Sequence, residues 1–343
     1  MKSLNLSATR TISTGSGVTV AVLDSGSFPH PDIRKNLLAG SDQTSSHHRD
    51  GRSDNDGHGT RMAALIAGHG RGTTRGIQGI APSAKVLPVV ITADGRGHAD
   101  LMARGVAWAS SQKAQIINIS GVAGPGFELQ DAIDEALDDD IVVVAAVGNT
   151  SSDAIINYPA AFDGVLAVGA TGRDGDYSSS SVKDEKVQIC APGVDIISAQ
   201  PPDRYGSATG TSDSTAIASG AAALIRAKFP NLSAKEVVHR LTATADDIGP
   251  PGRDDECGFG RLNIVKALTA DVPPLEGGGN ASSAPTSGAS SAAGAVRPEF
   301  ASPGAAAASE PASSNNGWLW GGLAGVIAAV GVVVGLVLRR RRT

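Results

Sequence analysis

Three polar residues stand in short, glycine-rich segments whose chemistry could hydrolyse an amide. Asp24 lies in Val-Leu-Asp-Ser-Gly, His58 in Asp-Gly-His-Gly-Thr, and Ser212 in Gly-Thr-Ser. A carboxylate, an imidazole and a hydroxyl are the orienting group, base and nucleophile of such a reaction. Taken alone, Asp-Ser-Gly after a strand is usually a turn, and a serine at a helix start is usually an N-cap. Together they predict that Asp24 orients the imidazole, His58 acts as general base, and Ser212 attacks the substrate.

The elements that would position these groups follow from the hydrophobic pattern. Continuous apolar runs typical of strands buried on both faces occur at residues 18–23, 86–91, 116–119, 141–147 and 165–168. Helical patterns alternate with them, at residues 62–66, 101–109, 129–137, 216–227 and 234–241. This alternation predicts a doubly wound α/β domain with a mostly parallel sheet over residues 1–270. In such sheets the chemistry gathers at the carboxyl ends of strands and the amino ends of helices.

The order Asp, His, Ser with these flanking residues resembles the subtilisin-like serine proteases, or subtilases, from about Gly15 to Leu268. The resemblance implies a subtilisin-like fold and an endopeptidase that cleaves protein or peptide substrates without a cofactor. It also implies a fourth catalytic residue, Asn149, whose amide would donate to the oxyanion together with the Ser212 backbone N–H.

The resemblance extends to substrate binding. Ser120-Gly121 and the segment 94–97 resemble the two strands that hold an extended peptide between them. Asn157 matches the floor of the primary specificity pocket, and a polar floor suggests a small or polar residue ahead of the scissile bond.

Two segments depart from the family pattern. Asp213 follows the serine, where most subtilases carry Met or a small residue, and we expect its charge to disfavour the nearby oxyanion. The segment 68–79, where many subtilases wrap a structural calcium, contains two arginines and no carboxylate. Since calcium prefers anionic oxygen ligands, we expect no metal there. The adjacent His47 and His48 point in divergent directions and are interpreted as a solvated loop rather than a metal site.

The C-terminal part of the chain predicts a membrane anchor. Residues 271–317 are rich in Ala, Ser, Gly and Pro and predict a disordered linker. Residues 318–338 contain no charge and, at about 1.5 Å per residue, could cross a hydrocarbon core of about 30 Å as one transmembrane helix. The basic tail 339–343 then marks the cytoplasmic side and places the protease domain outside the cell. No apolar signal segment follows Met1, so we expect translation to begin further upstream.

This architecture, with the segment 17–26, is similar to the mycosins, membrane-anchored subtilases of type VII secretion in actinobacteria. The similarity implies a secretion-complex partner and a secreted protein as substrate. An alternative is a catalytically weak or inactive subtilase that acts as a scaffold for such a complex. The net charge of −5 without a basic stripe argues against a nucleic-acid partner. Cys190 and Cys257 are compatible with one disulfide or with two buried thiols.

Overall fold

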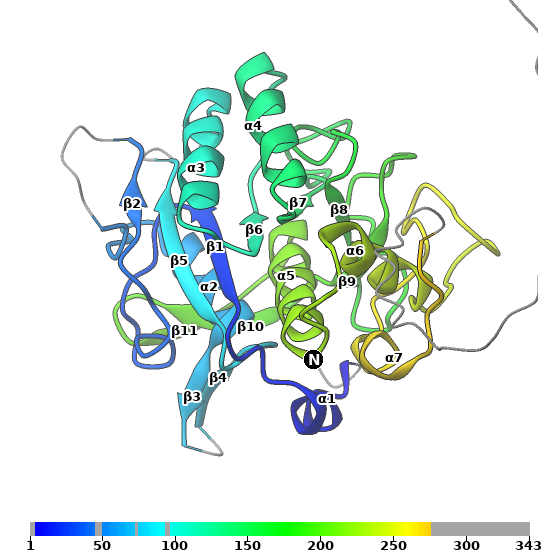
Figure 1. The fold of residues 1–343 in the computed structure, drawn as a ribbon, viewed down its shortest axis with the longest axis horizontal. Coiled ribbons are helices and arrows are strands. Elements are labelled where there is room, and N and C mark those ends of the chain that lie inside the picture. Colours follow the sequence, from blue (N-terminus) through cyan, green and yellow to red (C-terminus); the bar gives the residue numbers. More distant parts are fainter. Residues whose placement is uncertain (1–3, 45–49, 73–74, 93–96, 276–343) are drawn as a thin grey trace, which may run out of the picture. The chain divides into compact units, whose positions relative to one another are not determined.

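The computed structural model describes residues 4–44, 50–72, 75–92 and 97–275. Its centre is a parallel sheet of seven strands (Figure 1). In spatial order the strands are β2 (Ser41–Asp42), β5 (Lys85–Val90), β1 (Thr19–Asp24), β6 (Ile116–Ile119), β7 (Val142–Ala146), β8 (Leu166–Thr171) and β9 (Ile189–Pro192). Strands β5 and β2 lie on one side of β1, and β6 to β9 follow in order on the other side, with helices between several of them in the chain. This doubly wound arrangement confirms the predicted α/β class. The carboxyl ends of β1, β6 and β7 therefore meet at one edge of the sheet.

Successive side chains of each strand enter two different cores, because strand side chains alternate between the faces of a sheet. On β1, Val20 and Val22 enter the core that also contains helices α2 (His58–Ala67) and α5 (Thr211–Lys228). Ala21 and Leu23 enter the opposite core, beneath α3 (Ala99–Ser111) and α4 (Phe127–Asp138). Figure 1 shows α3 and α4 side by side. Helices thus cover both faces, as the continuous apolar runs predict.

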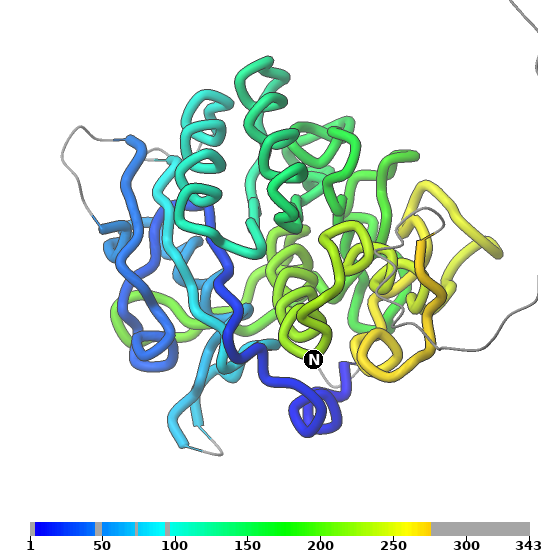
Figure 2. The backbone as a smooth tube through the Cα atoms, viewed as in Figure 1, coloured from blue at the N-terminus to red at the C-terminus, as the bar shows by residue number. Residues whose placement is uncertain are grey.

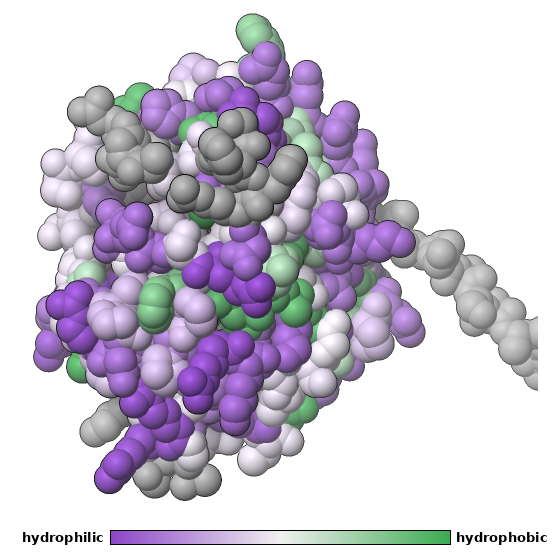
Figure 3. All heavy atoms as spheres, turned by 90° about the vertical axis from the view of Figure 1, so that its left-hand side faces the viewer, coloured by the Kyte–Doolittle hydropathy of each residue, from purple (hydrophilic) through white to green (hydrophobic). Residues whose placement is uncertain are grey.

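Several elements carry no strong sequence signal. They are α1 (Leu6–Ile12), α7 (Ile264–Thr269), the antiparallel ribbon β10 (Ile196–Gln200) with β11 (Arg204–Ala208), and the hairpin β3 (His69–Arg71) with β4 (Arg75–Gln78). Helix α6 (Ala234–Ala243), by contrast, is predicted by the helical pattern at residues 234–241. Helix α1 packs against α7, so the first and last described helices are neighbours (Figure 2). The face seen from the side of β2 and β11 is mostly hydrophilic, with hydrophobic residues gathered near its middle (Figure 3).

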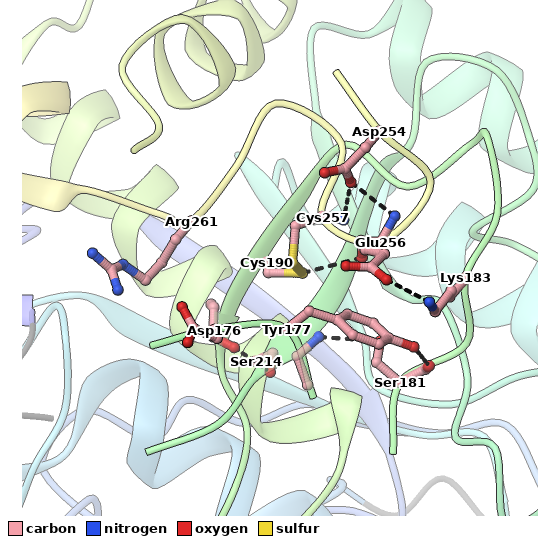
Figure 4. Close-up of a disulfide and its surroundings, with 12 residues drawn as sticks. Asp176, Tyr177, Ser181, Lys183, Cys190, Ser214, Asp254, Glu256, Cys257 and Arg261 are labelled. Carbon is pink, nitrogen blue, oxygen red and sulfur yellow. Dashed lines mark hydrogen bonds and ion pairs between the residues drawn. A yellow bond between two sulfur atoms is a disulfide. The ribbon is translucent and has the colours of Figure 1, made fainter. Parts of the chain in front are cut away.

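A disulfide joins Cys190 on β9 to Cys257 in the loop before α7 (Figure 4). Both cysteines are buried. The same loop also pairs with β9 through its backbone, since Cys190 N–H donates to the Gly260 carbonyl and Leu262 N–H donates to the Cys190 carbonyl. Of the two states compatible with the sequence, the structure contains the disulfide.

The hairpin β3–β4 occupies the segment 68–79, where many subtilases wrap a structural calcium. Arg71 donates from Nε to Asp32 at 2.8 Å and also pairs with Asp203. The Asp32 carboxylate is completely buried and accepts two further bonds, from the Ile77 N–H at 2.7 Å and the Tyr205 hydroxyl at 2.9 Å. A guanidinium therefore supplies the positive charge that this buried carboxylate requires.

Within the described residues, no helix is long and apolar enough to cross a membrane. The predicted anchor at 318–338, the basic tail and the linker beyond residue 275 lie outside those residues.

Candidate active site

Asp24 and His58 are in direct contact at the edge of the sheet. Asp24 is the last residue of β1 and is 5% exposed, and His58 is the first residue of α2. The imidazole Nδ1 lies 2.8 Å from Asp24 Oδ1 and 2.9 Å from Oδ2. The negative charge of Asp24 raises the pKa of His58 to about 9, while burial opposes this rise. A neutral His58 therefore carries its proton on Nδ1, and Nε2 is left as the acceptor.

The glycine after the histidine allows this contact. A Cβ atom on Gly59 would lie 2.0 Å from the Gly26 carbonyl oxygen and 3.1 Å from the Asp24 Cβ atom. Any larger residue would therefore push the start of α2 away from the end of β1, and Asp24 and His58 would separate.

Asp54 holds the start of α2 in place, a role that the sequence analysis missed. Its buried carboxylate accepts bonds through Oδ1 from Ser25 Oγ at 2.9 Å and the Gly57 N–H at 2.7 Å. Through Oδ2 it accepts from Thr60 N–H at 2.8 Å and Thr60 Oγ1 at 2.6 Å. It thus caps first-turn N–H groups that have no partner within the helix. The available signal was an acidic residue shortly before the helical pattern at residues 62–66, four positions before His58, where α2 starts.

Ser212 is the second residue of α5 and does not cap it. The N-cap is Gly210, whose φ of 170° is extended backbone, and no side chain provides a cap bond. The Ser212 hydroxyl instead donates to the Ser120 carbonyl at 2.9 Å. Among the described residues, His58 and Ser212 share no hydrogen bond, so the hydroxyl must rotate to reach the imidazole.

Asn149 follows β7 and is oriented toward α5. Its Oδ1 accepts from the Thr211 N–H at 2.9 Å and from Thr211 Oγ1 at 3.2 Å. Since the carbonyl oxygen is engaged there, the amide Nδ2 is the group that remains to donate. The Asn149 backbone N–H is itself held by Asp153 Oδ2 at 3.2 Å. This arrangement fixes Asn149 beside the nucleophile before any substrate arrives.

A buried chain of polar groups links α5 to the end of β6. Ser219 Oγ donates to Asn118 Oδ1 at 2.9 Å, and Asn118 Nδ2 donates to Ser120 Oγ at 3.0 Å. Ser120 Oγ then donates to the Ser212 carbonyl at 3.1 Å. Asn118 is completely buried in β6. A polar residue inside an apolar strand pattern was the sequence signal for this network, because a buried polar group requires hydrogen-bond partners. The network fixes Ser120 against the turn that carries Ser212.

A cavity of about 510 Å³ opens beside the Asp24–His58 pair. Ser120 and Gly121 line it, as does Gly97. Residues 94–96, predicted as part of the opposite substrate strand, lie outside the described residues. Asn157 is not among the residues that line this cavity. Its amide donates to Asp153 Oδ1 at 3.0 Å, so its role in specificity stays a prediction.

The expectation for Asp213 was wrong. Its carboxylate does not stand free near the oxyanion, because both oxygens bind Arg61, Oδ1 to Nε at 2.8 Å and Oδ2 to Nη2 at 3.0 Å. The charge beside the nucleophile is therefore compensated within the protein. Sequence reasoning could not pair two residues that lie 152 positions apart.

The described residues contain no group of three or more His, Cys, Asp or Glu side chains that could hold a metal ion. His47 and His48 lie outside those residues.

Comparison with known proteins agrees with this arrangement. The subtilase family model matches residues 15–260. Subtilisin BL from Lederbergia lenta is 38% identical over 238 residues, which cover 69% of this chain and 86% of the relative. The crystal structure of MycP1 with its N-terminal propeptide removed is similar with a TM-score of 0.72 and 32% identity, over 79% of this chain and 96% of that one. MycP3 protease from the type VII (ESX-3) secretion system gives a TM-score of 0.68 and 33% identity, over 79% and 87%. The chain therefore belongs to the subtilase family and is a serine endopeptidase of the subtilisin type.

Proposed function

We propose that this endopeptidase uses Ser212 as the nucleophile, His58 as the general base and Asp24 as the group that orients the imidazole. The observation that carries the proposal is the contact of His58 Nδ1 with both Asp24 oxygens, at 2.8 and 2.9 Å. In the neutral imidazole this contact keeps the proton on Nδ1 and leaves Nε2 unprotonated, which is the tautomer that a base requires.

The reaction follows from these positions. Rotation of the Ser212 hydroxyl away from the Ser120 carbonyl brings its proton to His58 Nε2, and Oγ attacks the substrate carbonyl carbon. The Asn149 Nδ2 and the Ser212 backbone N–H, a first-turn N–H without an intrahelical partner, donate to the oxyanion. The imidazolium gives its proton to the leaving amine as the peptide C–N bond breaks. Water, activated by the same imidazole, then hydrolyses the acyl-enzyme ester and restores Ser212.

A fluorophosphonate probe tests this assignment, because it reacts covalently with an activated serine. It should label the wild-type chain and should not label Ser212→Ala, with Ser214→Ala as the matched control that keeps its label. Ser214 lies two residues further along α5 and donates to the Ala191 carbonyl at 2.8 Å, away from the site. Equal labelling of the wild type and Ser212→Ala would contradict the proposal.

The same proposal includes a location at the cell membrane, with the protease domain outside. It is supported by the uncharged segment 318–338 and the four arginines that follow it. Protease treatment of intact cells should release the domain and leave a short C-terminal remnant. A domain that stays protected until the cells are broken would refute this topology.

We further propose a substrate that passes through a type VII secretion system. The support is the similarity to MycP3 protease, whose structure is described as coming from such a system. Mapping of protein N-termini in cells that carry wild type or Ser212→Ala should reveal a cleavage of a secreted protein that depends on Ser212. If the secreted proteins have the same N-termini in both strains, this substrate class is wrong.

A further inference from the structure

A buried ion pair joins the two helices that carry the proposed base and nucleophile. Arg61 lies on α2 one turn after His58, and Asp213 on α5 directly follows Ser212. The two side chains are 5% and 3% exposed. They meet through two parallel hydrogen bonds, Nε to Oδ1 at 2.8 Å and Nη2 to Oδ2 at 3.0 Å. This planar, two-point contact fixes direction as well as distance.

The remaining donors of the Arg61 guanidinium bind the ribbon β10–β11. Its Nη1 donates to the Gly206 carbonyl at 3.0 Å, and its Nη2 also donates to the Ile196 carbonyl. The Arg61 backbone carbonyl accepts from Ser198 Oγ at 2.9 Å. One side chain therefore connects α2, α5 and both strands of the ribbon.

Stability alone is a weak reason for such a pair. Removing two charges from water is costly, and apolar residues of similar size often replace a buried ion pair without loss of stability. The position of this pair is more informative, because α2 and α5 pack against each other and each presents one reacting group at its first turn. A misplacement of about 1 Å between such groups can lower a rate by about 10²-fold.

We propose that Arg61 and Asp213 are a positioning pair, which sets the orientation of α2 against α5 and so aligns His58 with Ser212. This inference rests on the proposed roles of those two residues. Neither member of the pair acts on the substrate. The two-point contact supplies the alignment, and the guanidinium compensates a carboxylate that would otherwise be an unpaired charge beside the reacting atoms.

The pair also affects the charge around the imidazole. The charged groups that face His58 are Asp24, which has the largest effect, and then Asp213 and Asp56, all of which raise its pKa. Burial raises the pKa of the Asp213 carboxyl, and Arg61 opposes that rise. Loss of Arg61 should raise the pKa of the Asp213 carboxyl further, and in the pH range where that carboxyl is still ionised its uncompensated charge should also raise the pKa of His58.

The test uses the full chain and a chromogenic peptide substrate, with active sites counted by the fluorophosphonate probe. Arg61→Lys keeps the positive charge but cannot form the two parallel hydrogen bonds to Asp213, so kcat should fall by about tenfold or more with KM unchanged. Arg61→Met should lower kcat by about 10²-fold and move the acid limb of the kcat/KM profile to higher pH. The double variant Arg61→Met/Asp213→Leu should recover its melting temperature and its acid limb, while kcat stays low.

The matched control is Arg226→Met. Like Arg61, Arg226 is a largely buried arginine, but it lies on α5 near the end opposite Ser212. Its Nη1 donates to Asp140 at 2.9 Å. The variant Arg226→Met should have a lower melting temperature than the wild type and an unchanged kcat.

Two results would overturn the inference: wild-type kcat in Arg61→Lys, or a double variant whose kcat returns together with its melting temperature. A wild-type chain that neither hydrolyses substrate nor reacts with the probe would instead refute the proposed function, and the inference with it. A labelled, active wild type with unaffected Arg61 variants refutes the inference alone.

Discussion

Asp54→Ala should unfold the start of α2 more than it disturbs the rest of the domain. Thr60, which is completely buried, loses the acceptor for both its N–H and its hydroxyl. Each buried donor left without a partner costs about 1–3 kcal/mol, and loss of a helix cap costs about 1 kcal/mol. The cap bond is one of these two Thr60 bonds, so it is counted once, and we expect the free energy of unfolding to fall by about 2–6 kcal/mol. Since His58 opens the same helix, kcat should fall as well.

Urea unfolding followed by circular dichroism measures this loss, with every variant made in the Ser212→Ala background so that self-cleavage does not interfere. Asp56→Ala is the matched control, because exposed Asp56 accepts one bond, from the His58 N–H at 3.1 Å. It should lose less than about 1 kcal/mol. If Asp54→Ala loses no more than Asp56→Ala, the carboxylate of Asp54 does not hold α2 and the reasoning is refuted.

Three further predictions concern the reaction and the disulfide. Asn149→Ala should lower kcat by about 10²–10³-fold, the range measured for this donor in subtilisin, and a change confined to KM would exclude an oxyanion role. Because the neutral form of His58 is the base and its pKa is raised to about 9, kcat/KM should continue to rise with pH well above 6.5. Asp24→Asn should move this rise to lower pH, since the charge of Asp24 is the main cause of the raised pKa. A pH profile that Asp24→Asn leaves unchanged would contradict that cause. Replacing both Cys190 and Cys257 by Ala should reduce the free energy of unfolding by about 4 kcal/mol on the loop-entropy relation for a separation of 67 residues, measured by urea unfolding, and an unchanged value would refute that relation here.

The sequence predicts the parts of the site that depend on local signals. The apolar run at residues 18–23 predicts a strand next to Asp24, and β1 spans Thr19–Asp24. The helical pattern at residues 62–66 predicts a helix shortly after His58, and α2 begins at His58 itself. Such features depend on neighbouring residues, because strand burial and helix initiation are decided within a few positions.

Contacts between distant segments could not be predicted in the same way. Asp213 next to the nucleophile suggested a repulsive charge, and only the packing of α2 on α5 reveals Arg61 as its partner. Strand β11 is exposed along most of its length, and neither strand of the ribbon contains a long apolar run, so the hydrophobic pattern alone did not separate the ribbon from a loop. A pairing of side chains across the fold depends on three-dimensional distance, which a single sequence does not contain.

The burial of α5 has a consequence for the timing of biosynthesis. This helix packs against α2 and against β6, β7, β8 and β9, so Ser212 acquires its position only after those strands have assembled. Strand β9 is in turn bordered by residues 260–262, through backbone bonds to Cys190. Because domains fold as units during synthesis, a chain still emerging from the ribosome would have Asp24 and His58 available but no positioned serine. Proteolytic activity would then begin only when the whole domain has left the ribosome, and truncated products would be unable to cleave their neighbours.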